Sequence, residues 1–208
     1  MARAPSLCGV ILAAGESSRM GTDKALLPWP PGQTEHTFLS AAIRLLNAFN
    51  DLVIVVAGNN EESIAPAVYA TSALLVRNPA PERGQLSSLQ VGLEEVLNQG
   101  RDAATIALVD RPPVAAATLK TLMAAFESAL AQEKWAVIPE YQGKHGHPIL
   151  ADREMIEAFL KAPASSSARE VEHANEEHIQ YVAVDDPNVA VNVNTPEDYA
   201  ALAPKAAP

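Results

Sequence analysis

Short apolar runs alternate along the chain with longer segments in which apolar residues recur at helical spacing. The runs carry almost no charge and end in turn residues, as is typical of strands buried inside a parallel sheet. The predicted strands are residues 7–14, 52–57, 73–77, 105–109, 136–138, 149–151, 181–184 and 189–193. The predicted helices are residues 38–49, 61–69, 86–97, 115–131, 152–160 and 165–178, with a last helix opened by Thr195-Pro196-Glu197. This alternation predicts an α/β fold of three layers, α/β/α, in which helices cover both faces of a mostly parallel sheet.

The length of the chain favours a single domain. With 208 residues, 48% of them hydrophobic, it can bury one sizeable core. The sequence shows neither an internal repeat nor a linker, so we expect one domain over residues 1–208, with the proline-rich tail 203–208 frayed. In open α/β sheets ligands bind beyond the carboxyl ends of the strands, and candidate residues are therefore sought in those loops.

The charge balance restricts the partners of the protein. Lysine and arginine number 15 against 25 aspartates and glutamates, a net charge of −10, which disfavours nucleic acid and anionic membranes. No apolar run approaches the roughly 18 residues that a membrane helix needs, and no signal-peptide pattern opens the chain. The single cysteine, Cys8, leaves no internal disulfide, so we expect a cytoplasmic protein. An anionic ligand would need local donors or a divalent cation to overcome this field.

The loop after the first predicted strand has the chemistry of an anion cradle. It matches neither the G-x-G-x-x-G dinucleotide fingerprint nor a Walker loop. Ala14, Gly15 and Ser17 can nevertheless offer backbone N–H groups, and glycine allows a phosphate to approach closely. Arg19 and Lys24 are the cations of this loop, and each can neutralise phosphate oxygens.

The sixteen residues LAAGESSRMGTDKALL, residues 12–27, resemble the signature L-A-A-G-x-S-x-R-M-G-x-x-K-x-L of the molybdenum cofactor nucleotidyltransferases, the MobA-like NTP transferases. The resemblance implies a Rossmann-like fold of the nucleotide-diphospho-sugar transferase type. It also implies that a nucleoside triphosphate is bound by Leu12, Ala13, Ala14, Gly15, Arg19 and Lys24. Arg19 and Lys24 would act in catalysis by steadying the charge on the departing pyrophosphate.

A second segment, from Asn78-Pro79 to Leu89, resembles the base-binding loop of the molybdenum cofactor cytidylyltransferase branch. Gly84 permits close approach to a flat base, while Gln85, Ser87 and Ser88 lie at the start of the next predicted helix. These four residues are the candidates for binding the nucleotide base. Capping of that helix by Ser87 is the plain structural alternative.

Two further motifs concern a metal ion. Leu108-Val109-Asp110-Arg111-Pro112-Pro113 is similar to a strand-end motif of the family, whose aspartate would hold Mg²⁺, with Mn²⁺ as a substitute; Arg111 departs from the neutral polar residue common there. The segment Val191–Tyr199 resembles the closing motif, written N-x-N-T-P-E-D in some relatives and D-x-D-T-P-E-D in many cytidylyltransferases. Asn192 is the expected second metal ligand and, with Asn194, is predicted to lie on one face of a strand. Because an amide brings no charge, metal affinity should depend mainly on Asp110 and the nucleotide.

The loop Tyr141–Pro148 resembles the G-x-x-G-H-P loop that lies over the acceptor pocket in this branch. Lys144 and His145 are candidates for contacting an acceptor phosphate, and His147 for orienting it; Asn194 is assigned to the same side. A zinc site built on His145 and His147 is an alternative, but cysteine or carboxylate partners are missing nearby in the sequence.

The resemblance implies Mg²⁺-dependent transfer of CMP from CTP to the terminal phosphate of molybdopterin, with release of pyrophosphate. The partners would be CTP or GTP, a phosphorylated pterin cofactor, and a molybdoenzyme that receives the product. Guanylyl transfer to the same cofactor and sugar-1-phosphate nucleotidyl transfer are the enzymatic alternatives. A nucleotide-binding module without catalysis, or a plain α/β scaffold with coincidental motifs, are the alternatives from other classes.

Overall fold

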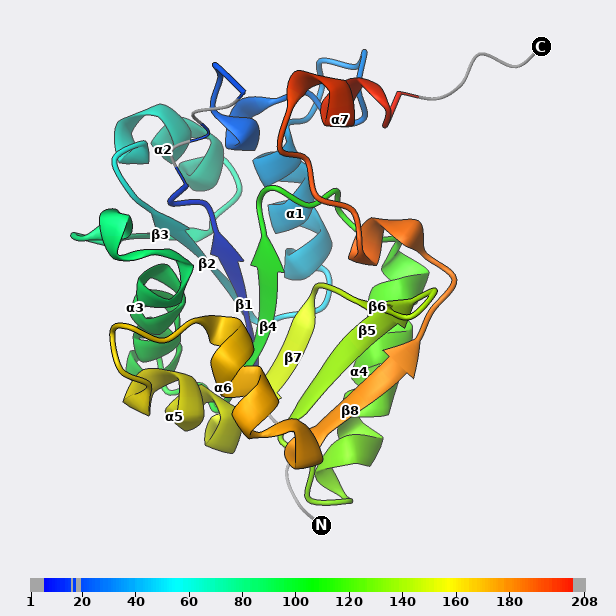
Figure 1. Ribbon diagram of the computed structural model, residues 1–208. Coiled ribbons are helices and arrows are strands. Elements are labelled where there is room, and N and C mark those ends of the chain that lie inside the picture. Colours follow the sequence, from blue (N-terminus) through cyan, green and yellow to red (C-terminus); the bar gives the residue numbers. More distant parts are fainter. Residues whose placement is uncertain (1–5, 16, 18–19, 204–208) are drawn as a thin grey trace.

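The computed structural model describes residues 6–15, 17 and 20–203. One eight-stranded sheet forms the middle of three layers, with helices on each side (Figure 1). The strands are β1 (Leu7–Leu12), β2 (Leu52–Ala57), β3 (Leu74–Arg77), β4 (Ala103–Leu108), β5 (Ala136–Tyr141), β6 (Lys144–His145), β7 (Ile149–Asp152) and β8 (Ile179–Ala183). The α-helices are α1 (Phe38–Asn47), α2 (Glu61–Tyr69), α3 (Gln85–Asn98), α4 (Ala116–Leu130), α5 (Arg153–Lys161), α6 (Ala168–Ala174) and α7 (Pro196–Ala200). Short 3₁₀ turns are η1 (Lys24–Leu26), η2 (Pro81–Arg83), η3 (Glu176–His178) and η4 (Pro187–Val189).

The sheet has the strand order β3-β2-β1-β4-β7-β5-β6, and β8 pairs with β5. Strands β3, β2, β1 and β4 are parallel, as are β5 and β8, whereas β7 runs antiparallel to both β4 and β5. The connection from β5 to β7 contains only the small strand β6, too short for the crossover that a parallel neighbour requires. The predicted mostly parallel α/β architecture is therefore confirmed.

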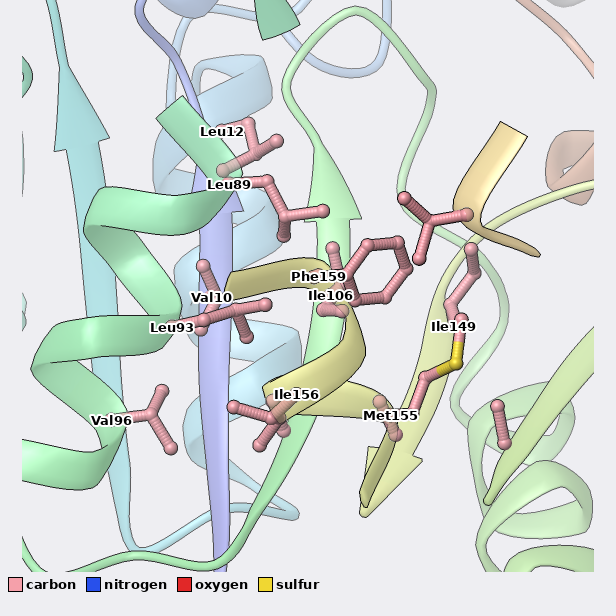
Figure 2. Packing of buried hydrophobic residues seen from close by; sticks show 14 of the residues in the cluster. Val10, Leu12, Leu89, Leu93, Val96, Ile106, Ile149, Met155, Ile156 and Phe159 are labelled. Atoms are coloured by element: carbon pink, nitrogen blue, oxygen red, sulfur yellow. The ribbon is translucent and has the colours of Figure 1, made fainter. Parts of the chain in front are cut away.

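Helices cover both faces of the sheet because the central strands are apolar on both sides. In β1, Val10 and Leu12 belong to the cluster under α3 and α5, while Ile11 faces the cluster under α1 and α2. Figure 2 shows the first cluster, in which Leu93 of α3 and Phe159 of α5 point toward the sheet. In Figure 1, residues 20–37, which follow β1 in the chain, and α7 lie beyond the carboxyl ends of β1 and β4, where a ligand is expected.

The helix starts follow the sequence signals. Thr37 caps α1 and Asp152 caps α5, each through its side chain, and Thr195 forms a capping box with Asp198 at the start of α7. The stretch 165–178, predicted as helical, divides into α6 and η3. None of the helices in the described part of the chain combines the length and apolar character needed to cross a bilayer.

The predicted strand over residues 189–193 is wrong. After β8, the buried carboxylate of Asp186 accepts hydrogen bonds from the start of α4 and from the backbone of Asn188, which turns the chain into η4. Val189 and Val193 are buried by packing and not by pairing with a strand. Apolar residues two apart therefore misled the prediction. Of the tail expected to fray, 203–208, all but Ala203 lies outside the described residues.

A substitution in α3 tests the close packing of this helix on the sheet. A Cβ added at Gly92 would lie 2.8 Å from a Val10 methyl and 2.9 Å from a Val56 methyl. Both methyls belong to stiff β-branched side chains, so Gly92→Ala should lower the free energy of unfolding by about 1–2 kcal/mol despite the better helix propensity of alanine. Denaturant titration measures this, and Glu94→Ala, an exposed change in the same helix, should stay within about 0.5 kcal/mol of the wild type. Equal stability of Gly92→Ala and the wild type would contradict the packing described.

Candidate functional site

Two adjoining cavities open at the carboxyl ends of β1 and β4. The first cavity, of about 300 Å³, collects residues from three of the segments singled out in the sequence. Its lining comprises Leu12, Ala14, Gly15, Ser17, Lys24, Pro81, Gly84, Gln85, Ser88, Leu108, Val109 and Asp110. The second cavity, of about 670 Å³, shares Leu12, Gln85 and Leu108 with the first. Ligands bound in the two cavities would therefore be neighbours.

Lys24 and Asp110 meet at the first cavity. The Lys24 Nζ lies 3.9 Å from Asp110 Oδ2 and donates a hydrogen bond of 3.1 Å to Asn194 Oδ1. The backbone N–H of Val193 donates to the carbonyl of Asp110 at 2.8 Å. The Lys24 side chain is only 12% exposed, so its charge is held in place rather than free in solvent. The predicted catalytic residue Arg19 lies outside the described residues.

The position of Lys24 depends on a residue that the sequence analysis did not assign, Asn60. Asp23 caps η1 by accepting from the backbone of Ala25, and its other carboxylate oxygen accepts from Asn60 Nδ2 at 2.7 Å. Asn60 Nδ2 also donates to the carbonyl of Ala13. Asn60 thereby ties the loop of Lys24 to the end of β1. The available signal was its place after the second predicted strand, which ends at the same edge of the sheet.

The segment around Gly84 forms one wall of the first cavity. Gly84 has a φ of 97°, a conformation suited to glycine, and α3 begins at the next residue. The buried Asn78 amide donates to the hydroxyls of both Ser87 and Ser88, at 2.9 Å each, and the Ser87 hydroxyl donates to the Gly84 carbonyl. Gly84, Gln85 and Ser88 line the cavity, whereas the hydroxyl of Ser87 is used to hold the loop.

The two asparagines of the closing motif do not share a strand face, because no strand forms there. Asn192 is exposed and lines neither cavity, while Asn194, expected at the acceptor side, lies beside Lys24 instead. Within the described ranges, no three histidine, cysteine or acidic residues gather as a metal site would require. The available hard donors are the carboxylate of Asp110 and amide oxygens, which fit a magnesium or manganese ion only if triphosphate oxygens complete its coordination.

The second cavity holds the predicted acceptor residues. Lys144, His145 and His147 all line it, and the ring of His145 stacks on that of Tyr181 at a centroid distance of 3.9 Å. Burial lowers the pKa of His147 to about 3, so this ring is neutral at physiological pH. Its backbone N–H donates to the carbonyl of Val189 at 3.0 Å. His147 is thus a half-buried, uncharged part of the cavity wall.

Glu172 also lines the second cavity, and the burial of its carboxyl can be tested by the pH dependence of stability. Burial raises the pKa of its carboxyl to about 7, although Arg169 and Arg111 act in the opposite direction. The folded state then binds a proton that the unfolded state releases at lower pH, so this group costs stability as pH rises from about 4.5 to 7. Glu172→Gln, which cannot ionise, should exceed the wild type in unfolding free energy by about 1–3 kcal/mol at pH 8 and by little at pH 4.

Denaturant titrations at the two pH values measure this difference. The exposed change Glu94→Gln should leave the pH dependence of the wild type unaltered. If Glu172→Gln and the wild type lose stability in parallel between pH 4 and pH 8, the Glu172 carboxyl is not buried as described.

Comparison with known proteins identifies the family of the chain. Residues 9–179 match the family model described as the MobA-like NTP transferase domain. The chain is 32% identical to the molybdenum cofactor guanylyltransferase of Xanthomonas euvesicatoria over 93% of each chain. It is 23% identical to the molybdenum cofactor cytidylyltransferase of Escherichia coli, over 91% of this chain and 92% of that protein.

Among solved structures, that of Rv0371c from Mycobacterium tuberculosis has a TM-score of 0.80 at 27% identity, covering 97% of this chain and 98% of that one. A structure of Rv0371c in complex with manganese has a TM-score of 0.74 at 24% identity, covering 95% and 97%. The family model spans most of the chain, including the greater part of β1, the segment around Gly84, and Asp110. This protein belongs to the MobA-like NTP transferase family.

Proposed function

We propose that this protein transfers a nucleotidyl group from a nucleoside triphosphate to the terminal phosphate of the molybdenum cofactor pterin and releases pyrophosphate. The observation that carries the proposal is the meeting of Lys24, Asp110 and the Gly15 and Gly84 loops in one cavity that adjoins a larger one. Two joined cavities suit a reaction with two large substrates, and the names of the relatives supply the identity of those substrates.

The chemistry requires charge neutralisation more than a general base. An oxygen of the acceptor phosphate, already anionic near neutral pH, forms a bond to the α-phosphorus. The bond from the α-phosphorus to the bridging oxygen of the β-phosphate breaks, and pyrophosphate leaves with that electron pair. Lys24 neutralises charge on the leaving phosphates, as Arg19 does by family resemblance. Holding both substrates across the shared wall of Leu12 and Leu108 supplies the proximity that the step needs.

A divalent cation belongs to this proposal. Asp110 would be its main protein ligand, with an asparagine of the closing motif as a neutral second donor, as expected for Mg²⁺. The motif favours Asn192 for this role, although Asn192 lines neither cavity and Asn194 is the one that lies beside Lys24. Manganese in the related mycobacterial structure supports a divalent ion of this type. When bound, such an ion neutralises triphosphate charge. Lys24, 3.9 Å from Asp110, is placed to neutralise the neighbouring phosphates.

For the nucleotide we propose GTP, with CTP as the second candidate. Ser87 and Ser88 favoured CTP in the sequence, but both hydroxyls accept hydrogen bonds from Asn78, and the Ser87 hydroxyl also donates to the Gly84 carbonyl. The loop containing His147 lies at the second cavity and does not bear on the base. The greater identity to a guanylyltransferase, 32% against 23%, then favours guanine.

An assay of pyrophosphate release tests the activity and the nucleobase preference together. It contains phosphorylated pterin, Mg²⁺ and one of GTP, CTP, UTP or ATP. Lys24→Ala and Asp110→Ala should each lower turnover roughly a hundredfold or more, because each removes a preorganised charge. Lys161→Ala, an exposed change on α5, should behave as the wild type. If pyrophosphate is released with CTP alone, the nucleotide is CTP and not GTP. If a nucleotide raises the melting temperature but no pyrophosphate is released, the protein is a nucleotide-binding module and not an enzyme. Near wild-type turnover in either charge variant would contradict the assigned roles.

A further inference from the structure

Two consecutive residues after β4 serve different cavities. Asp110 lines the first cavity, and Arg111 lines the second. The two cavities share Leu12, Gln85 and Leu108, so groups bound by these two side chains would be neighbours. In the proposed function, this is where the α-phosphate of the nucleotide and the phosphate of the acceptor must meet.

Among the described residues, Arg111 is anchored by a hydrogen bond to a backbone carbonyl and not by an ion pair. One guanidinium nitrogen, Nη1, donates to the carbonyl of Val189 at 2.8 Å. Arg77, Arg101 and Arg153 form ion pairs with carboxylates, whereas Arg111 has no such partner among the residues that the structure describes. Its Nε is buried and has no hydrogen-bond partner within the same residues. Burial lowers the pKa of Arg111, and the charges of Asp110 and Glu172 act in the opposite direction. A half-buried guanidinium with an unused donor and no ion-pair partner among the described residues is suited to an anion.

The orientation of Arg111 is fixed by the loop containing His147. The carbonyl of Val189 accepts from both Arg111 Nη1 and the backbone N–H of His147. A Cβ at Gly146 would overlap that same carbonyl, so only glycine allows the loop to approach Val189. Because His147 is neutral, it adds no second charge at this point, and Arg111 provides the positive one.

The other cations that line the second cavity, Lys144 and Arg169, do not line the first. Lys144 is exposed on the β5–β6 hairpin, and Arg169 is exposed on α6. The acidic residues that line the cavity, Glu172 and Glu176, also belong to α6 and the turn after it. Only Arg111 follows directly on the residue that faces the nucleotide.

Resting on the proposed function, we infer that Arg111 binds the terminal phosphate of the acceptor and holds it for attack on the α-phosphorus. The guanidinium donates to phosphate oxygens that do not react, while a remaining oxygen forms the new P–O bond and pyrophosphate departs with the electrons of the broken one. Arg111 thereby makes the site selective for a phosphorylated pterin over the same pterin without phosphate.

Binding of pterin cofactor extracted from a denatured molybdoenzyme, before and after phosphatase treatment, tests this inference by fluorescence titration. The wild type should bind the phosphorylated form at least about tenfold more tightly. Arg111→Gln keeps an amide donor for the Val189 carbonyl but removes the charge, so it should lose this preference and raise the acceptor KM by a similar factor. Arg111→Lys should keep part of the preference for the phosphorylated pterin. Arg153→Met, an exposed change on α5, should keep all of it.

The outcomes separate the inference from the proposed function. If the wild type binds neither pterin nor a nucleoside triphosphate, the proposed function fails. If the wild type prefers the phosphorylated pterin and Arg111→Gln keeps that preference with an unchanged nucleotide-induced thermal shift, the role of Arg111 is overturned. Should Arg111→Gln fold poorly, Arg111→Lys decides, because full retention of the preference and of the acceptor KM would equally overturn it.

Discussion

The contact between Lys24 and Asp110 is the constraint on which the site depends. In a protein with a net charge of −10, a polyphosphate is repelled at long range, and only charges fixed close to it can reverse that effect. The structure fixes the ammonium of Lys24, from the loop after β1, between Asp110 at the end of β4 and Asn194 in the closing motif. The sheet makes this possible, because neighbouring parallel strands end at the same edge.

The second feature is that two consecutive residues at the end of β4 line different cavities. A group-transfer enzyme must bring two anions together, although they repel each other. Here Asp110 faces the cavity assigned to the nucleotide, and Arg111 faces the cavity assigned to the acceptor. The turn around Gly146 and the carbonyl of Val189 hold the guanidinium in place, so the two binding sites are built from one rigid corner of the fold.

Much of this was accessible from the sequence. β1, β2 and β4 were predicted because strands buried on both faces read as continuous apolar runs, and α1 and α3 because their apolar residues recur at helical spacing. The cavity residues Gly15, Lys24, Gly84 and Asp110 followed from motifs at strand ends. What sequence could not give was side-chain partnership across long separations. Three side-chain hydrogen bonds exist only in the folded chain, and no local pattern encodes them. They join Asn60 to Asp23, Asn78 to Ser87 and Ser88, and Asn194 to Lys24.

The dependence of nucleotide affinity on a divalent cation tests the central claim most directly. Isothermal titration of GTP and CTP into the wild type and Asp110→Asn, each with Mg²⁺ and with chelator, separates the contribution of the Asp110 carboxylate from that of Lys24. In the wild type, Mg²⁺ should strengthen binding at least about tenfold, and in Asp110→Asn this gain should largely disappear while metal-free binding persists. Equal affinities with and without Mg²⁺ in the wild type, or an undiminished gain in Asp110→Asn, would contradict a polyphosphate held between Lys24 and a metal on Asp110.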